Sequence, residues 1–176
     1  MIIIPDAIWS LMLREFQACQ RPLEQVAYLD GLETDNDGIV TTVTFPNAVL
    51  RQGSFFVPAE AMSEAGRHLG KPLVRIAQVH THPTAWVGHS PTDDERAYSR
   101  HDGAVSIILP NYGAALNLLS ELGVHLCRGK TWRQLTSEQA KTFLKIVPSS
   151  LDFRPRIEPG PKTRPSFFRR LLRRFL

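Results

Sequence analysis

The chain has 176 residues, of which 43% are hydrophobic and 22% charged, values typical of a folded protein with an ordinary core. This length suits one domain and is short for two. The net charge of +4 lies at one end, because residues 150–176 hold eight of the 21 basic side chains and two of the 17 acidic ones, which leaves the rest at −2. We therefore predict that the folded part binds no nucleic acid.

Cysteine content and the N-terminal residues bear on the compartment. Cys19 and Cys127 are far apart and belong to no C-x-x-C pair, so neither a disulfide framework nor a thiolate zinc site is indicated. Residues 1–6 lack a basic region and a small-residue cleavage site, and no apolar run is long enough to span a bilayer. These features favour a cytoplasmic protein.

The first half of the chain alternates between helical and strand patterns. Apolar residues at three-to-four spacing predict the first helix, and the turn residues 34–38 predict a hairpin between two β-prone runs. Pro58 suits a helix start and Gly70 a helix end. The expected elements are a helix over 5–20, strands over 24–31 and 39–45, a helix over 58–69 and a strand over 73–79.

The second half continues the mixture. Ser90 and Pro91 are typical of a helix start, and three acidic residues that follow favour the positive end of the helix dipole. The expected elements are a helix over 90–100, strands over 104–109, 115–120 and 124–127, and a helix over 137–146. The sequence therefore predicts one α/β domain over residues 1–147, with a mixed sheet flanked by helices.

The C-terminal end differs in composition from the rest. Five prolines interrupt residues 148–165, which we interpret as a linker. In residues 166–176, pairs of arginines alternate with apolar pairs, which would form a basic amphipathic helix. Such a helix would contact an anionic membrane surface or an acidic partner; a disordered tail is the alternative, since a helix this short is marginal alone.

A run of potential metal ligands follows the strand over 73–79. His80 and His82 are two residues apart, so both rings face the same side of an extended chain and can converge on one ion. The loop 83–89 then leads to a helix start, where Asp93 can supply a third ligand. Three protein ligands and one open position are typical of a catalytic zinc site, although a lone H-x-H pair is more often a surface feature.

Several neighbours of this run have competing interpretations. Asp94 and Glu95 are helix-start charges, and His89 either contacts substrate or is merely solvated. Trp86 either contacts substrate or covers the core. The other histidines, His68, His101 and His125, have no ligand spacing and receive no role.

The pattern H-x-H-P followed by S-x-x-D resembles the JAMM (MPN-plus or JAB) metallopeptidases. Their upstream motif P-x-E-x-x-G-x-L-x-G is similar to residues 22–31, in which Pro22, Glu24, Leu29 and Gly31 match, whereas Val26 and Ala27 depart from the pattern. The resemblance implies an MPN/JAB, cytidine-deaminase-like architecture. It also implies Zn2+ held by His80, His82 and Asp93, with Glu24 as general base and Ser90 as hydrogen-bond donor to the oxyanion.

The same resemblance implies a substrate. Family members hydrolyse the peptide or isopeptide bond after the C-terminus of ubiquitin or a ubiquitin-like modifier, whose tail would bind as an added strand. This short chain is similar to bacterial members encoded beside activating and conjugating enzymes, including antiphage systems. The alternatives are a same-fold peptidase for phage-tail or cell-wall peptides or sulfur-carrier processing, and a non-catalytic MPN scaffold.

Overall fold

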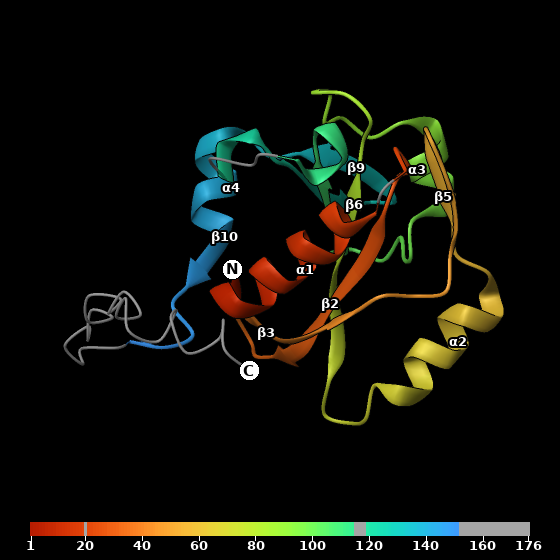
Figure 1. The fold of residues 1–176 in the computed structure, drawn as a ribbon. Coiled ribbons are helices and arrows are strands. Elements are labelled where there is room, and N and C mark those ends of the chain that lie inside the picture. The colour runs from red at the N-terminus through yellow and green to blue at the C-terminus, as the bar shows by residue number, and fades with distance from the viewer. Residues whose placement is uncertain (20, 115–118, 152–176) are drawn as a thin grey trace, which may run out of the picture.

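A mixed sheet of eight strands forms the centre of the protein, as the computed structural model of residues 1–19, 21–114 and 119–151 shows (Figure 1). Neighbouring strands are parallel in some pairs and antiparallel in others. In order across the sheet the strands are β10 (Leu144–Val147), β1 (Ile2–Pro5), β3 (Gly38–Thr44), β2 (Val26–Glu33), β6 (Val74–Thr81), β7 (Val105–Leu109), β8 (Gly123–Arg128) and β9 (Thr131–Gln134).

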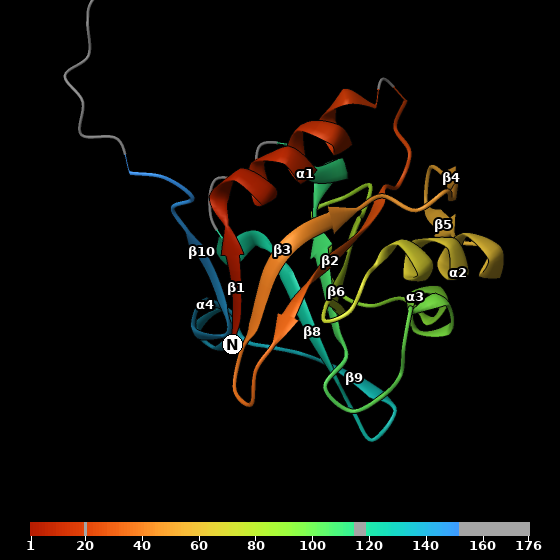
Figure 2. The same cartoon turned by 90° about the horizontal axis from the view of Figure 1, so that it is seen from below.

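The helices flank this sheet. Helix α1 (Asp6–Ala18) packs over β1, β3 and β10 and buries Trp9, Met12 and Phe16 against them. Figures 1 and 2 place α2 (Ala59–His68) and α3 (Pro91–Arg96) on the side of the molecule away from α4 (Ser137–Phe143). Two 3-10 helices complete the set, η1 (Asn111–Gly113) and η2 (Leu119–Glu121).

A separate hairpin lies beside α3. Strands β4 (Val49–Arg51) and β5 (Ser54–Phe56) pair only with each other among the described strands. The Arg96 guanidinium, at the end of α3, donates to the Phe55 carbonyl of β5 at 2.9 Å, which ties the hairpin to this helix. The hairpin thereby borders the region where β6 ends.

Strands β2, β6 and β7 form the buried middle of the sheet. Strands β6 and β7 are parallel and end together, with Thr81 opposite Leu109, and every residue of β7 is buried. Ligands bind in α/β proteins beyond the carboxyl ends of such strands, where loops leave the sheet. The chain emerges there from Thr81 into the loop that precedes α3.

The expected α/β domain with a mixed sheet and flanking helices is confirmed, but three expected elements are wrong in part. The helix over 90–100 ends at Arg96, because Ala97 takes an extended conformation with ψ of 138°. The helix over 137–146 ends at Phe143, because Leu144–Val147 pairs with β1. Of the expected strand over 115–120, residues 119–120 belong to η2, and residues 115–118 lie outside the described residues.

Five short strands of the described residues escaped prediction, namely β1, β4, β5, β9 and β10. Most of the expected linker over 148–165 and the whole tail over 166–176 lie outside the described residues. Within residues 1–19, 21–114 and 119–151, no helix is both long and apolar enough to cross a membrane.

Candidate metal centre

The two histidines of the H-x-H pair are placed by the sheet. His80 lies in β6 between Val26 of β2 and Ile108 of β7, and its side chain is fully buried. His82 follows the strand, and its backbone N–H donates to the Leu109 carbonyl at 2.8 Å, which extends the pairing by one step. Because residues two apart in an extended chain face the same way, the two rings lie together, as predicted.

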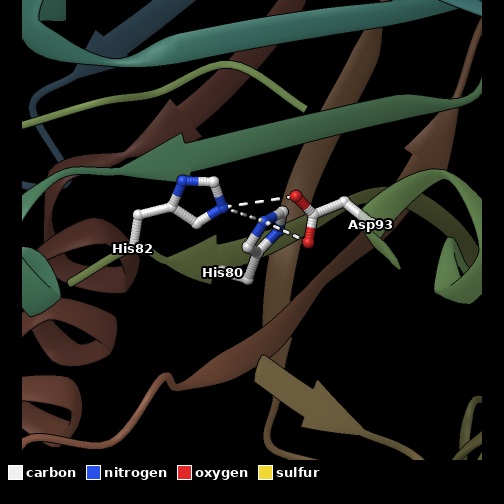
Figure 3. A group of neighbouring side chains, drawn as sticks. All are labelled: His80, His82 and Asp93. Carbon is white, nitrogen blue, oxygen red and sulfur yellow. Dashed lines mark hydrogen bonds and ion pairs between the residues drawn. The ribbon is translucent and has the colours of Figure 1, made fainter. Parts of the chain in front are cut away.

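Asp93 completes a buried group of three (Figure 3). The Nε2 atoms of His80 and His82 are 3.2 Å apart. Nε2 of His80 lies 3.5 Å from Oδ1 of Asp93, and Nε2 of His82 lies 3.4 Å from Oδ2. The structure therefore brings together the three residues that the sequence singled out as ligands.

These separations suit one metal ion. A tetrahedral ion with bonds of ~2.0–2.2 Å holds its donor atoms ~3.3–3.6 Å apart. The two Nε2 atoms are 3.2 Å apart, each lies 3.4–3.5 Å from a different oxygen of the Asp93 carboxylate, and one ligand atom from each residue lies within 4.8 Å of the other two. Two imidazoles and one carboxylate are also a common ligand set for zinc in hydrolases. The residues thus fit a divalent cation in both chemistry and spacing.

The protonation state of His80 and the tautomer of His82 suit ligation. Burial lowers the pKa of His80 to about 3, so this ring is neutral at neutral pH. Burial also lowers the pKa of His82, but the hydrogen bond and charge of Asp93 outweigh it and raise the pKa overall. Nδ1 of His82 lies 3.0 Å from the Trp86 carbonyl, an acceptor that requires a proton on Nδ1. When neutral, His82 therefore keeps its lone pair on Nε2, the atom that faces Asp93.

A capping box at the start of α3 orients Asp93. The Ser90 backbone N–H and hydroxyl each donate to Oδ2 of Asp93 at 2.7 Å, and Ser90 Oγ accepts the Asp93 N–H at 3.1 Å. Although burial raises the pKa of Asp93, hydrogen bonds from His82 and Ser90 and the charge of His80 hold it well below its usual range. Asp93 is consequently an ionised, fixed carboxylate.

Glu24 lies beside the group, just before β2. Val26 pairs with His80, and Gln25 exchanges hydrogen bonds with Thr81, so the same register sets Glu24 opposite His82. Its side chain is 3% exposed. Burial raises the pKa of Glu24 to about 7, while the charge of His82 lowers it and that of Asp93 raises it. A carboxyl group that titrates near neutral pH beside potential metal ligands can both accept and return a proton.

His89, expected to contact substrate or to be solvated, and His125, which received no role, both lie beside the candidate metal centre. Rather than being solvated, the His89 side chain is 6% exposed, and its ring centroid lies 4.4 Å from that of His125 and 4.7 Å from that of Trp132. His89 also lies 6.1 Å from His80 by ring centroids. The position of His125 inside an apolar strand run, Gly-Val-His-Leu-Cys, could have indicated that its side chain is buried.

Trp86 covers the outer side of His82. The two rings stack with centroids 5.2 Å apart and an interplanar angle of 21°, while Trp86 stays 55% exposed. The indole lies so close to Gly88 that a Cβ there would come within 2.7 Å of it. Trp86 is thus an exposed aromatic surface next to the candidate metal centre and does not cover the core.

Comparisons with known proteins bear on the fold. No family model matches the chain, and no curated protein sequence matches it. The solution structure of protein DSY2949 from Desulfitobacterium hafniense is similar with a TM-score of 0.64 at 17% identity, over 84% of this chain and 94% of that one. AF2198, a JAB1/MPN domain protein from Archaeoglobus fulgidus, matches with a TM-score of 0.46 at 13% identity, over 83% of this chain and 97% of that one. At such identities the likeness to DSY2949 concerns the fold alone.

Proposed function

We propose that this chain is a zinc metallopeptidase of the JAMM type, which hydrolyses the bond after the C-terminus of a ubiquitin-like modifier. The observation that carries the proposal is the buried group His80, His82 and Asp93, whose potential ligand atoms lie within 4.8 Å of one another. Two imidazoles and one carboxylate hold zinc in known hydrolases, so zinc is the ion that we propose.

Bound zinc would supply a Lewis acid that polarises the scissile carbonyl and acidifies a water molecule. Glu24 would accept the proton of the attacking water and deliver it to the departing amine. Its pKa of about 7 in the metal-free site shows how strongly burial acts on this carboxyl, and the charge of a cation would lower that pKa toward the ionised form that a base needs. The effect of the charges of His82 and Asp93 on the pKa of Glu24 supports this role, because it requires the three groups to be close together.

Ser90 would donate a hydrogen bond to the oxyanion. Its hydroxyl carries one proton, which Asp93 Oδ2 accepts in this structure. The Ser90 backbone N–H also donates to Oδ2, so Asp93 keeps one of these hydrogen bonds when the hydroxyl turns to substrate. Helix capping and oxyanion binding are therefore compatible roles for the same residue.

An extended substrate tail would bind along the β4–β5 hairpin. It lies against the metal centre, because the Phe55 ring is 5.2 Å from that of His80 by centroids. Within the described residues neither β4 nor β5 pairs with a third strand, so each has an edge to which a peptide strand can add. The exposed rings of Phe56 and Trp86 would flank such a peptide. Activating and conjugating enzymes of the same system are the proposed partners.

Metal analysis with cleavage assays tests the proposal. The purified protein should contain zinc, cleave a ubiquitin-like fusion at the modifier's C-terminus, stop with a chelator and recover with added zinc. Glu24→Gln should keep the metal and lose about 10²–10⁴-fold in rate, as expected for removal of a general base. The exposed Glu33 provides the matched control, and Glu33→Gln should cleave normally.

Other outcomes would redirect the assignment. Full activity in Glu24→Gln would show that another group is the base. Cleavage of a cell-wall peptide and not of the fusion would change the substrate class. A zinc-loaded protein that cleaves neither substrate would favour a scaffold.

A further inference from the structure

His89 is the last residue of the loop 83–89, which joins the histidine pair of the candidate metal centre to the helix that carries Asp93. A carboxylate contacts its ring on one side. Its Nδ1 lies 2.8 Å from Oδ1 of Asp94 in the first turn of α3. A carboxylate only accepts hydrogen bonds, so Nδ1 of His89 carries the proton. In a neutral ring with the proton on Nδ1, Nε2 is an acceptor.

The candidate ligand His80 lacks a hydrogen-bond acceptor for its second ring nitrogen within the described residues. Its Nε2 faces His82 and Asp93, so in a neutral ligating ring the proton is on Nδ1. Nδ1 of His80 and Nε2 of His89 are both buried, and neither has a hydrogen-bond partner in the part of the chain that the structure describes. One is a donor without an acceptor and the other an acceptor without a donor.

The two rings are neighbours. Their centroids are 6.1 Å apart and their planes meet at 63°, an edge-to-face arrangement. The other rings in contact with His80 belong to Phe55, which has no acceptor atom, and His82, whose Nδ1 is engaged with the Trp86 carbonyl. Ligating histidines nearly always donate their second N–H to a fixed acceptor. Among these rings, His89 is the one that offers it.

We propose that His89 is a positioning residue for the metal ligand His80. The Nδ1–H of His80 donates to Nε2 of His89, after a small ring rotation or through one water, and Asp94 holds His89 from the far side. This chain of three fixes the orientation of His80 and increases its basicity toward the ion. The inference rests on the metal site of the proposed function, but not on any substrate.

Trp132 offers the competing explanation. Its Nε1–H is also buried without a partner among the described residues, and its ring packs against His89. If Nε2 of His89 served Trp132 instead, or if His89 only filled space in this stack, the state of His89 would not affect the metal. Trp132→Phe removes that donor and preserves an aromatic ring, so it is the matched control.

Zinc affinity measured by chelator competition, with the visible spectrum of the Co2+ form, tests the proposal. His89→Phe keeps the ring volume and removes the acceptor, so zinc should bind about 10–100-fold more weakly. His89→Gln restores an acceptor oxygen and should recover most of this loss. Trp132→Phe should bind zinc like the wild type. The thermal midpoint without metal should change little in His89→Phe, because the loss of the hydrogen bond to the half-exposed Asp94 is offset by the removal of a buried unpaired nitrogen.

Several results would overturn the inference. Wild-type zinc affinity in His89→Phe would refute it, as would an equal loss in Trp132→Phe. If His89→Phe does not fold, Asp94→Ala, at a half-exposed position, provides the second test and should still weaken zinc binding. If the wild type binds zinc but cleaves no peptide, weaker zinc binding in His89→Phe would still support the inference, while the peptidase proposal would be refuted. Absence of zinc binding by the wild type would refute both.

Discussion

Replacement of Glu24 by glutamine should make the metal-free protein more stable at pH 8. In the zinc-loaded protein the same change should slow cleavage. Burial raises the pKa of this carboxyl from its ordinary 4.5 to about 7. Each pKa unit corresponds to about 1.4 kcal/mol, so full ionisation in the folded state costs roughly 3 kcal/mol, and relaxation of the site reduces this to about 1–3 kcal/mol. Glutamine has nearly the same shape and carries no charge, so the variant avoids this cost.

The sign of the pH dependence follows from linkage. The folded state holds the Glu24 proton more tightly than the unfolded state, so the stability of the wild type falls as pH rises from about 4.5 to about 7. Below that window both forms of residue 24 are neutral, and the variant should gain nothing. The difference between variant and wild type should therefore be near zero at pH 4.5 and fully developed at pH 8.

Urea denaturation with a chelator present, at half-unit steps from pH 4.5 to 8, measures this difference. Glu33→Gln, at an exposed position, controls for the general effect of removing one negative charge. Saturating zinc should reduce the gain, because a nearby cation favours the ionised glutamate. A pH-independent difference, or a variant less stable than wild type at pH 8, would refute the assignment of Glu24 to a desolvated position beside the donor group.

Three further predictions concern the metal and the sheet. Zinc at about 100 times its dissociation constant should raise the free energy of unfolding by about 2.7 kcal/mol, and Asp93→Asn should abolish most of this gain in thermal scans. Gly31→Ala should cost about 1–3 kcal/mol in urea denaturation, because its Cβ would lie 2.0 Å from the Ile39 carbonyl oxygen. Asp30→Asn should cost about 3 kcal/mol, since it leaves the Arg75 guanidinium without its buried partner at 3.1 Å; an unchanged midpoint would contradict this.

Local patterns were enough to predict the elements that carry the site. The turn residues at 34–38 define the β2–β3 hairpin, and the apolar run before His80 defines β6. The Ser90 cap predicted where α3 begins, because capping depends on residues within one turn. The end of α3 was less predictable, since no cap or glycine marks Arg96.

The missed strands depend on distant partners. Residues 2–5 and 144–147 are four-residue segments that pair with each other across nearly the whole described chain. Neither segment has the length or the alternation that identifies a strand by itself. Only the tertiary pairing distinguishes Leu144–Val147 from a further turn of α4, so the helix over 137–146 was extended too far.

The candidate site was predictable in its ligands and not in its surroundings. Spacing, together with the resemblance to the JAMM motif, singled out His80, His82 and Asp93, because strand alternation and a helix start fix where those side chains point. The position of Glu24 depends on the β2–β6 register, which shifts at an irregularity between Leu29 and Asp30. His89 could not be assigned, because its burial depends on His125 and Trp132 from strands far along the chain.

The candidate metal centre buries ionisable groups, whereas the rest of the sheet buries mostly apolar side chains. Burial lowers the pKa of His80 to about 3 and raises that of Glu24 to about 7, so both groups are driven toward their neutral forms. Asp93 alone keeps its charge firmly, through hydrogen bonds from Ser90 and His82. The result is one fixed anion, Asp93, beside a neutral His80 and beside His82, whose pKa Asp93 raises, so a bound cation would take the place of the proton on Nε2 of His82. The bonds that begin α3 are also those that orient Asp93, so Ser90 contributes to the metal centre through the helix start itself.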